Sequence, residues 1–250
     1  MYALGVAGLG LQQFFYPGFR PVFVPAWSES LPDPEPLMYL FSVGLIAASG
    51  CVLFNIKAKS ALLILAIVFL LFALLLHVPF NISNNLISPG AWTNALKILA
   101  FSGGALIIAD SFEDDESEKP SALNRMLEKM IPAGRFFFGI MLIVFGIDHF
   151  LYAQFVATLV PDWIGGHMFW TYFAAIALIG SGVSLITKIK IVLVSLLMGI
   201  MIFLWFLILH IPRAIAMPDV DNGNELTSVF QALAFSGVGF VLAGTMSNRQ

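Results

Sequence analysis

Long apolar stretches run through the chain and restrict what it can fold into. The plainest is residues 61–80, which reads ALLILAIVFLLFALLLHVPF and contains no Asp, Glu, Lys or Arg. About 20 apolar residues are enough to cross the hydrocarbon core of a bilayer as a helix. Only 11% of the 250 residues are charged and 59% are hydrophobic, whereas a soluble domain averages about 25% charged residues. The sequence therefore predicts an integral membrane protein and excludes a soluble enzyme and a disordered chain.

About eight stretches of this kind can be distinguished. They cover residues 1–16, 37–56, 61–80, 92–110, 134–153, 168–187, 190–212 and 225–245. All should be helices, because an open strand would leave backbone groups unpaired in lipid. We therefore expect an all-α polytopic membrane protein of about eight transmembrane helices, of which the first is short or begins upstream of residue 1.

Lysine and arginine are unevenly distributed over the connections. One side carries Lys57, Lys59, Lys119, Arg125, Lys129, Arg135, Lys188, Lys190 and Arg249. The other side carries Arg20 and Arg213, with Lys97 just inside a span. Because cytoplasmic loops are rich in Lys and Arg, both termini are predicted to be cytoplasmic. The slight excess of acidic over basic residues, a net charge of −3, argues against a nucleic-acid partner.

The second half of the chain repeats the first. The segment 12–27 (QQFFYPGFRPVFVPAW) aligns with 148–163 (DHFLYAQFVATLVPDW), LLLHVP at 74–79 aligns with LILHIP at 207–212, and LAFSG at 99–103 recurs at 233–237. We therefore predict two four-helix units, residues 1–110 and 133–250. Residues 111–132 would form an acidic linker and a short amphipathic cytoplasmic helix capped by Ser121. Since each unit has an even number of spans, the two would have the same orientation, as a parallel repeat.

The first long connection of each unit contains the motif Val-Pro-x-Trp. Its members are Pro25 and Trp27 in the first unit and Pro161 and Trp163 in the second. Proline fixes a turn and tryptophan anchors at the level of the lipid headgroups, so a structural role is favoured for all four. Residues 17–36 hold six of the 13 prolines and are expected to form an extended, rigid connection.

Several polar side chains fall near the outer ends of the spans. The candidates for a polar pocket are Gln13, His77, Lys97, Asp148, His149, His210 and Arg213. Ionisable groups within a membrane domain are a default functional hypothesis. The alternative is structural, because groups within one turn of a helix end can reach water and act as anchors. The one cysteine excludes an internal disulfide, and no metal site is predicted.

Residues 134–244 resemble the DoxX and DoxX-like family of small four-span bacterial membrane proteins. The resemblance rests on Gly134-Arg135 opening a helix, His149-Phe150 ending it, and the Val-Pro-x-Trp that follows. Residues 5–109 match less well, so the chain resembles two such units fused. The resemblance implies a four-helix transmembrane bundle in the bacterial inner membrane. It also implies an association with membrane redox systems, which include a quinone-reducing thiosulfate oxidoreductase subunit, and it transfers no catalytic residues.

Three functions remain open. The first is a redox-associated subunit that binds a quinone or a partner near the outer interface, with His149, Asp148, His210 and Arg213 contacting the headgroup. Since no side chain here carries electrons well, a bound cofactor or a partner protein would have to supply them. The second is a scaffold or assembly protein that binds other membrane proteins without catalysis. The third is a carrier of a small molecule or lipid, with a site between the units. Whether the protein is an enzyme stays open.

Overall fold

The computed structural model describes residues 1–26, 33–112 and 121–249. Within these ranges every regular element of secondary structure is a helix. The longer helices are α1 (Tyr2–Gln12), α2 (Glu35–Leu53), α3 (Ala58–Phe72), α5 (Thr93–Ala109), α7 (Gly134–Leu151), α9 (His167–Thr187), α10 (Ile191–Trp205) and α12 (Asn224–Ser247). The shorter ones are α4 (Val78–Ser83), α6 (Ala122–Glu128), α8 (Ala153–Ala157) and α11 (Ile211–Ala216). The expected all-α membrane fold is confirmed.

Seven helices in the described ranges are long and apolar enough to cross a membrane. In two of them one α-helix continues into the next, α3 into α4 and α10 into α11, giving the composite spans Ala58–Ser83 and Ile191–Ala216. In two others a shorter helical segment comes first, a 3₁₀ turn before α5 in Pro89–Ala109 and α6 before α7 in Ala122–Leu151. The remaining apolar helix, α1, has 11 residues and spans about 16 Å. That is about half the thickness of a bilayer core. The protein is therefore a multi-pass membrane protein, and its described residues include seven long spans and one short apolar helix.

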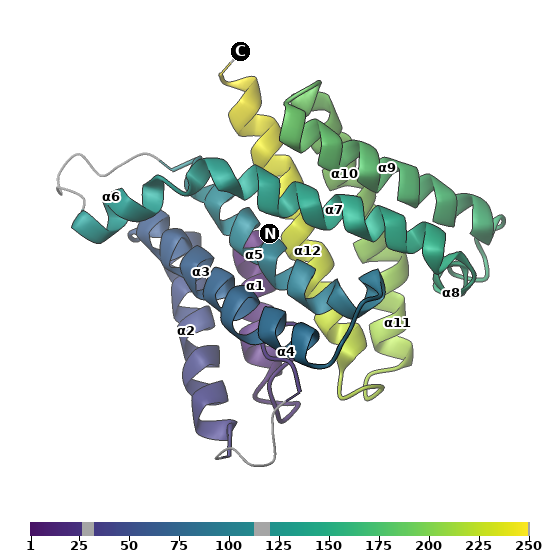
Figure 1. Ribbon diagram of the computed structural model, residues 1–250, viewed down its shortest axis with the longest axis horizontal. Coiled ribbons are helices and arrows are strands. Elements are labelled where there is room, and N and C mark those ends of the chain that lie inside the picture. The colour runs from purple at the N-terminus through teal and green to yellow at the C-terminus, as the bar shows by residue number, and fades with distance from the viewer. Residues whose placement is uncertain (27–32, 113–120, 250) are drawn as a thin grey trace.

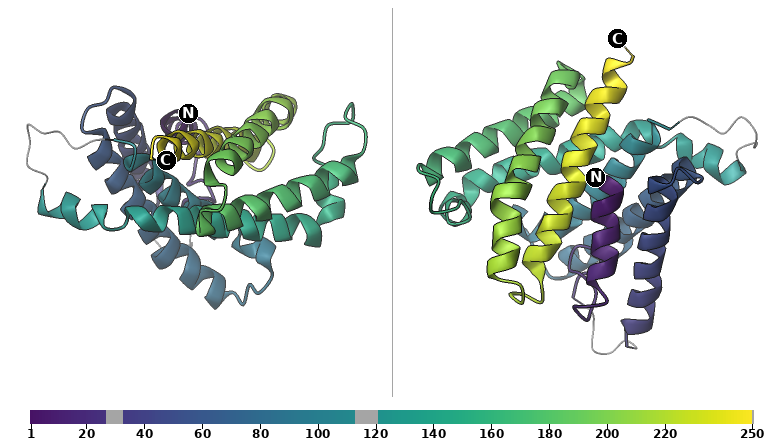
Figure 2. Two further views of the ribbon diagram at one scale, coloured as in Figure 1. Left: turned by 90° about the horizontal axis from the view of Figure 1, so that it is seen from above. Right: turned by 180° about the vertical axis from the view of Figure 1, so that it is seen from behind.

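The helices form two crossing layers. In one layer α2, α1, α12 and α10 pack side by side in that order, and in the other α3, α5, α7 and α9 do so. Contacts of α2 with α3, α5 with α12 and α9 with α10 join the layers. The first layer is best seen from behind (Figure 2), and the second lies in front in Figure 1. Helices from the two halves of the chain thus meet at the centre of each layer, where α1 packs on α12 and α5 packs on α7.

Glycine permits close approach of the helices at the centre. A Cβ atom on Gly103 of α5 would lie 2.7 Å from the carbonyl oxygen of Gly134 and 2.9 Å from the backbone nitrogen of Phe138. A Cβ atom on Gly237 of α12 would lie 2.9 Å from the backbone nitrogen of Tyr2. Small residues serve this purpose at helix contacts in membranes, where backbones can then approach closely.

Substitution of Gly103 by alanine should therefore destabilise the protein. The added methyl group meets backbone atoms of α7 that cannot rotate away, and overpacking of this kind costs about 1–3 kcal/mol. The midpoint of thermal unfolding in detergent, followed by size-exclusion chromatography, measures the effect. The control is Gly44→Ala in α2, where a Cβ atom meets nothing within 4 Å. An equal midpoint for the two variants would show that the α5–α7 contact is looser than described.

The connection after α1 differs from the extended segment expected from its prolines. Residues 20–24 turn inward, with the backbone nitrogen of Phe23 donating to the carbonyl of Arg20 at 2.8 Å. The Phe23 side chain is fully buried, with its ring centroid 6.0 Å from that of Phe69 and 5.0 Å from that of Phe41. Burial of this ring explains the turn, since an extended connection would leave it in water.

The segment after the linker agrees with the sequence. The Ser121 hydroxyl accepts a hydrogen bond from the backbone nitrogen of Asn124 at 3.1 Å and caps α6. The Asn124 side chain donates to the Ser60 hydroxyl at 2.6 Å, so α6 is attached to the start of α3. The predicted cap is confirmed.

Candidate functional site

Two turns of π-helix interrupt the composite spans at matching positions. They are Ala73–His77, before α4, and Phe206–His210, before α11. Each is followed two residues later by proline, Pro79 or Pro212. A proline inside a helix has no N–H to donate and its ring crowds the carbonyl four residues earlier, which explains a widened turn here. Such turns are frequent at functional sites, and each of these ends at a histidine.

A cavity of about 710 Å³ lies beside the second π-turn. Residues from α5, α7, α8, α9, α10 and α12 line it, and most are apolar. The polar side chains among them are Thr93, Lys97, Asp148, His149, Thr171, His210, Ser228 and Gln231. Ligand pockets typically have this character, an apolar wall of about 300–1,000 Å³ with a few polar groups.

Four of the seven predicted pocket residues lie together in this cavity. They are Lys97 from α5, Asp148 and His149 from α7, and His210 from the second π-turn. Lys97 is in the second turn of α5, and Asp148 and His149 are in the last turn of α7. Because α5 and α7 are adjacent and antiparallel, these helix ends meet.

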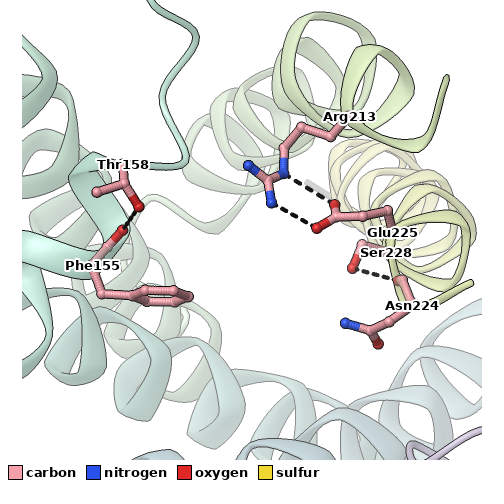
Figure 3. Close-up of polar contacts among 6 residues, drawn as sticks. All are labelled: Phe155, Thr158, Arg213, Asn224, Glu225 and Ser228. Atoms are coloured by element: carbon pink, nitrogen blue, oxygen red, sulfur yellow. Dashed lines mark hydrogen bonds and ion pairs between the residues drawn. The ribbon is translucent and has the colours of Figure 1, made fainter. Parts of the chain in front are cut away.

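A fifth predicted residue, Arg213, does not line the cavity and forms an ion pair with an acidic residue. Its Nε donates to one oxygen of Glu225 at 3.0 Å and its Nη2 to the other at 2.7 Å. Figure 3 shows this pair together with Phe155, which lines the cavity. Since α11 continues beyond Pro212, Arg213 comes from the helix that carries His210. The ion pair joins α11 to α12.

The other two predicted residues, Gln13 and His77, lie outside the cavity. The Gln13 side chain donates to the Ser42 hydroxyl at 2.7 Å and accepts from the backbone nitrogen of Arg20 at 3.3 Å. His77 donates its Nε2–H to the carbonyl of Phe23 at 3.2 Å. Both are buried and hydrogen-bonded, so they hold the first connection in place instead of contributing to a pocket.

Arg135 and the described prolines and tryptophan of the Val-Pro-x-Trp motifs do not line the cavity. Arg135 donates to the carbonyl of Leu185 at 2.9 Å and so joins α7 to α9. Pro25 and Pro161 are half-buried, and Trp163 is 74% exposed, as an anchor at the headgroup level would be. Trp27 lies outside the described residues.

Polar atoms around the cavity lack hydrogen-bond partners. Asp148 Oδ1 and His210 Nδ1 are buried and have none in the described part of the chain. His149 differs, because its Nδ1–H donates to the carbonyl of Phe145 at 2.7 Å. A carbonyl can only accept, so in the neutral ring Nε2 is left as an acceptor. Buried polar atoms are nearly always bonded, so Asp148 Oδ1 and His210 Nδ1 are left to bond a polar group that enters the cavity.

Sequence reasoning missed the apolar and aromatic part of the site. Trp170 and Trp205 line the cavity, together with Met141, Leu178 and Ile202. In an apolar span these residues are indistinguishable from lipid-facing ones. Gln231 was detectable, because the repeat aligns it with Lys97, and both line the cavity.

The described residues contain no group of three or more His, Cys, Asp or Glu side chains placed to hold a metal ion. Comparisons with protein-family models, with curated proteins and with solved structures found no match for the chain. Any functional conclusion therefore depends on the cavity itself.

Proposed function

We propose that the protein binds the polar head of a lipid-soluble small molecule, of the quinone class, in this cavity. The observation that carries the proposal is a mostly apolar cavity of about 710 Å³ containing Lys97, Asp148 and His210. A ring would contact the apolar wall, and its oxygens would accept hydrogen bonds from Lys97 and from His210 in its Nδ1-protonated form. Binding of this kind suits a redox-associated membrane subunit whose electrons come from a bound cofactor or a partner protein.

We propose further that the chain consists of two DoxX-like units, residues 1–110 and 133–250. Matching features support this division. The two π-turns are at equivalent positions, and the aligned glycines Gly103 and Gly237 face the aligned backbone nitrogens of Phe138 and Tyr2. With both termini in the cytoplasm of a bacterial inner membrane, as the distribution of Lys and Arg favours, the polar groups of the cavity would lie near the outer interface.

Binding of a short-chain benzoquinone to the purified protein in lipid nanodiscs tests the proposal. Quenching of tryptophan fluorescence reports it, because Trp170 and Trp205 line the cavity. The variant Ala174→Phe places a ring in the cavity and should weaken binding at least tenfold. Ile176→Phe, a matched control on the same helix at a position 65% exposed, should bind as the wild type does. Equal affinities of the two variants would contradict the proposal.

A further inference from the structure

We infer that the bound head carries a hydroxyl group, whose oxygen accepts a hydrogen bond from Lys97 and whose proton is donated to Asp148. The inference rests on the proposed binding function and narrows its ligand class. It favours lipid-soluble phenols and hydroquinones over fully oxidised quinones.

The first half of the inference concerns the donor Lys97. It lines the cavity, and within the described ranges no hydrogen bond or ion pair joins its ammonium group to another residue. An ammonium group has three hydrogens to donate and cannot accept. Glu225 already binds Arg213 through both oxygens. An ammonium group that lines a mostly apolar cavity without an acceptor is costly in a membrane domain, so a ligand oxygen that accepts from it would stabilise the site.

The second half of the inference concerns two acceptors that line the same cavity, Asp148 and His149. Asp148 Oδ1 is buried without a hydrogen-bond partner among the described residues. The Nε2 atom of His149 remains free to accept a hydrogen bond, because its Nδ1–H donates to the carbonyl of Phe145. An ionised carboxylate and an unprotonated ring nitrogen can only accept. The carbonyl oxygen of a quinone has no hydrogen and would satisfy Lys97 alone, whereas a hydroxyl group satisfies a donor and an acceptor together.

The packing of α5 against α7 brings Lys97 and Asp148 within reach of the same ligand head. Near one end of the pair, Gly103 faces the backbone of Phe138, and near the other Gly90 faces the ring of Tyr152. Counting along the antiparallel helices between these contacts puts Lys97 opposite residue 144, one turn from Asp148. One turn is about 5.4 Å along the helix axis. Both side chains line the same cavity, so one ligand head in it can contact both.

The test is an anaerobic binding measurement with a short-chain benzoquinol and the benzoquinone that has the same tail. A hydrogen bond to a charged group changes affinity by roughly tenfold or more. We therefore expect the wild type to bind the quinol at least about tenfold more tightly, and Asp148→Asn to reduce this preference to within about threefold. Asp162→Asn is the control, because Asp162 is exposed in the connection that follows α8. It should keep the wild-type preference.

Two further measurements make the outcome decisive. Asp148→Asn should elute from size-exclusion chromatography and unfold in detergent as the wild type does, which shows that the variant is folded. Lys97→Gln, which introduces the residue found at the aligned position 231, should weaken both forms. Equal binding of quinol and quinone by the wild type, or a preference that survives in Asp148→Asn, would overturn the inference while leaving the proposed function intact. Failure of both forms to bind would overturn the proposed function as well.

Discussion

Replacement of Phe23 by alanine is expected to lower the free energy of unfolding by about 3–5 kcal/mol, the usual range for a buried phenylalanine. The ring is fully buried between Phe41 and Phe69. The backbone carbonyl of Phe23 accepts a hydrogen bond from His77. Loss of the ring leaves a cavity that these rigid neighbours cannot close, and it loosens the connection that follows α1.

Chemical denaturation in detergent, followed by circular dichroism, measures this effect. Phe15→Ala is the matched control, since Phe15 lies in the same connection and is 78% exposed. It should change stability by less than about 0.5 kcal/mol. A similar loss of stability in both variants would mean that Phe23 does not pack as described.

Arg20→Ala is expected to cost about 3 kcal/mol, because it leaves several backbone carbonyls without their donor. The guanidinium is almost completely buried and donates to the carbonyl of Asn222 through Nη1. Through Nη2 it donates to the carbonyls of Tyr16 at 3.0 Å, Gly18 at 3.2 Å and Pro17 at 3.4 Å. Burial lowers the pKa of Arg20 and the nearby Tyr16 opposes that shift. The group nevertheless stays charged at neutral pH.

Two controls separate this role from a general effect of removing an arginine. Arg20→Lys keeps the charge but cannot spread its donors over the same carbonyls, so it should recover only part of the stability. Arg249→Ala removes an arginine whose side chain is 51% exposed in its ion pair with Asp110, and such a pair contributes less than about 1 kcal/mol. If Arg20→Ala unfolds at the same denaturant concentration as Arg249→Ala, the carbonyl contacts of Arg20 are not stabilising.

The helices could be predicted from the sequence because lipid imposes a simple rule, that apolar stretches of sufficient length form helices. The predicted end of the third span was wrong, because a proline can either end a helix or widen one turn within it. The third span was expected to end at residue 80, beside Pro79, but it continues to Ser83 through the π-turn before α4. The order of helices in each layer was also beyond prediction, since every span offers small residues and apolar surface to its neighbours.

The candidate site was only partly predictable for a related reason. Polar residues near the helix ends were recognisable, but aligned positions in the two halves behave differently. Phe23 fills the space beside His77, whereas the aligned Leu159 only lines the cavity that contains His210. Whether such a space is filled or open depends on how a connection folds, and hydrophobic periodicity carries no information about that.

The central claim is that the cavity lined by Lys97, Asp148 and His210 takes up a lipid-soluble molecule from the membrane. Native purification in mild detergent, followed by mass spectrometry of the extracted small molecules, tests it most directly. The wild type and Ile176→Phe should carry the same quinone-class compound in a molar ratio near one, and Ala174→Phe should carry about a tenth as much or less. No such compound above the detergent background in the wild type, or equal amounts in Ala174→Phe, would contradict the claim.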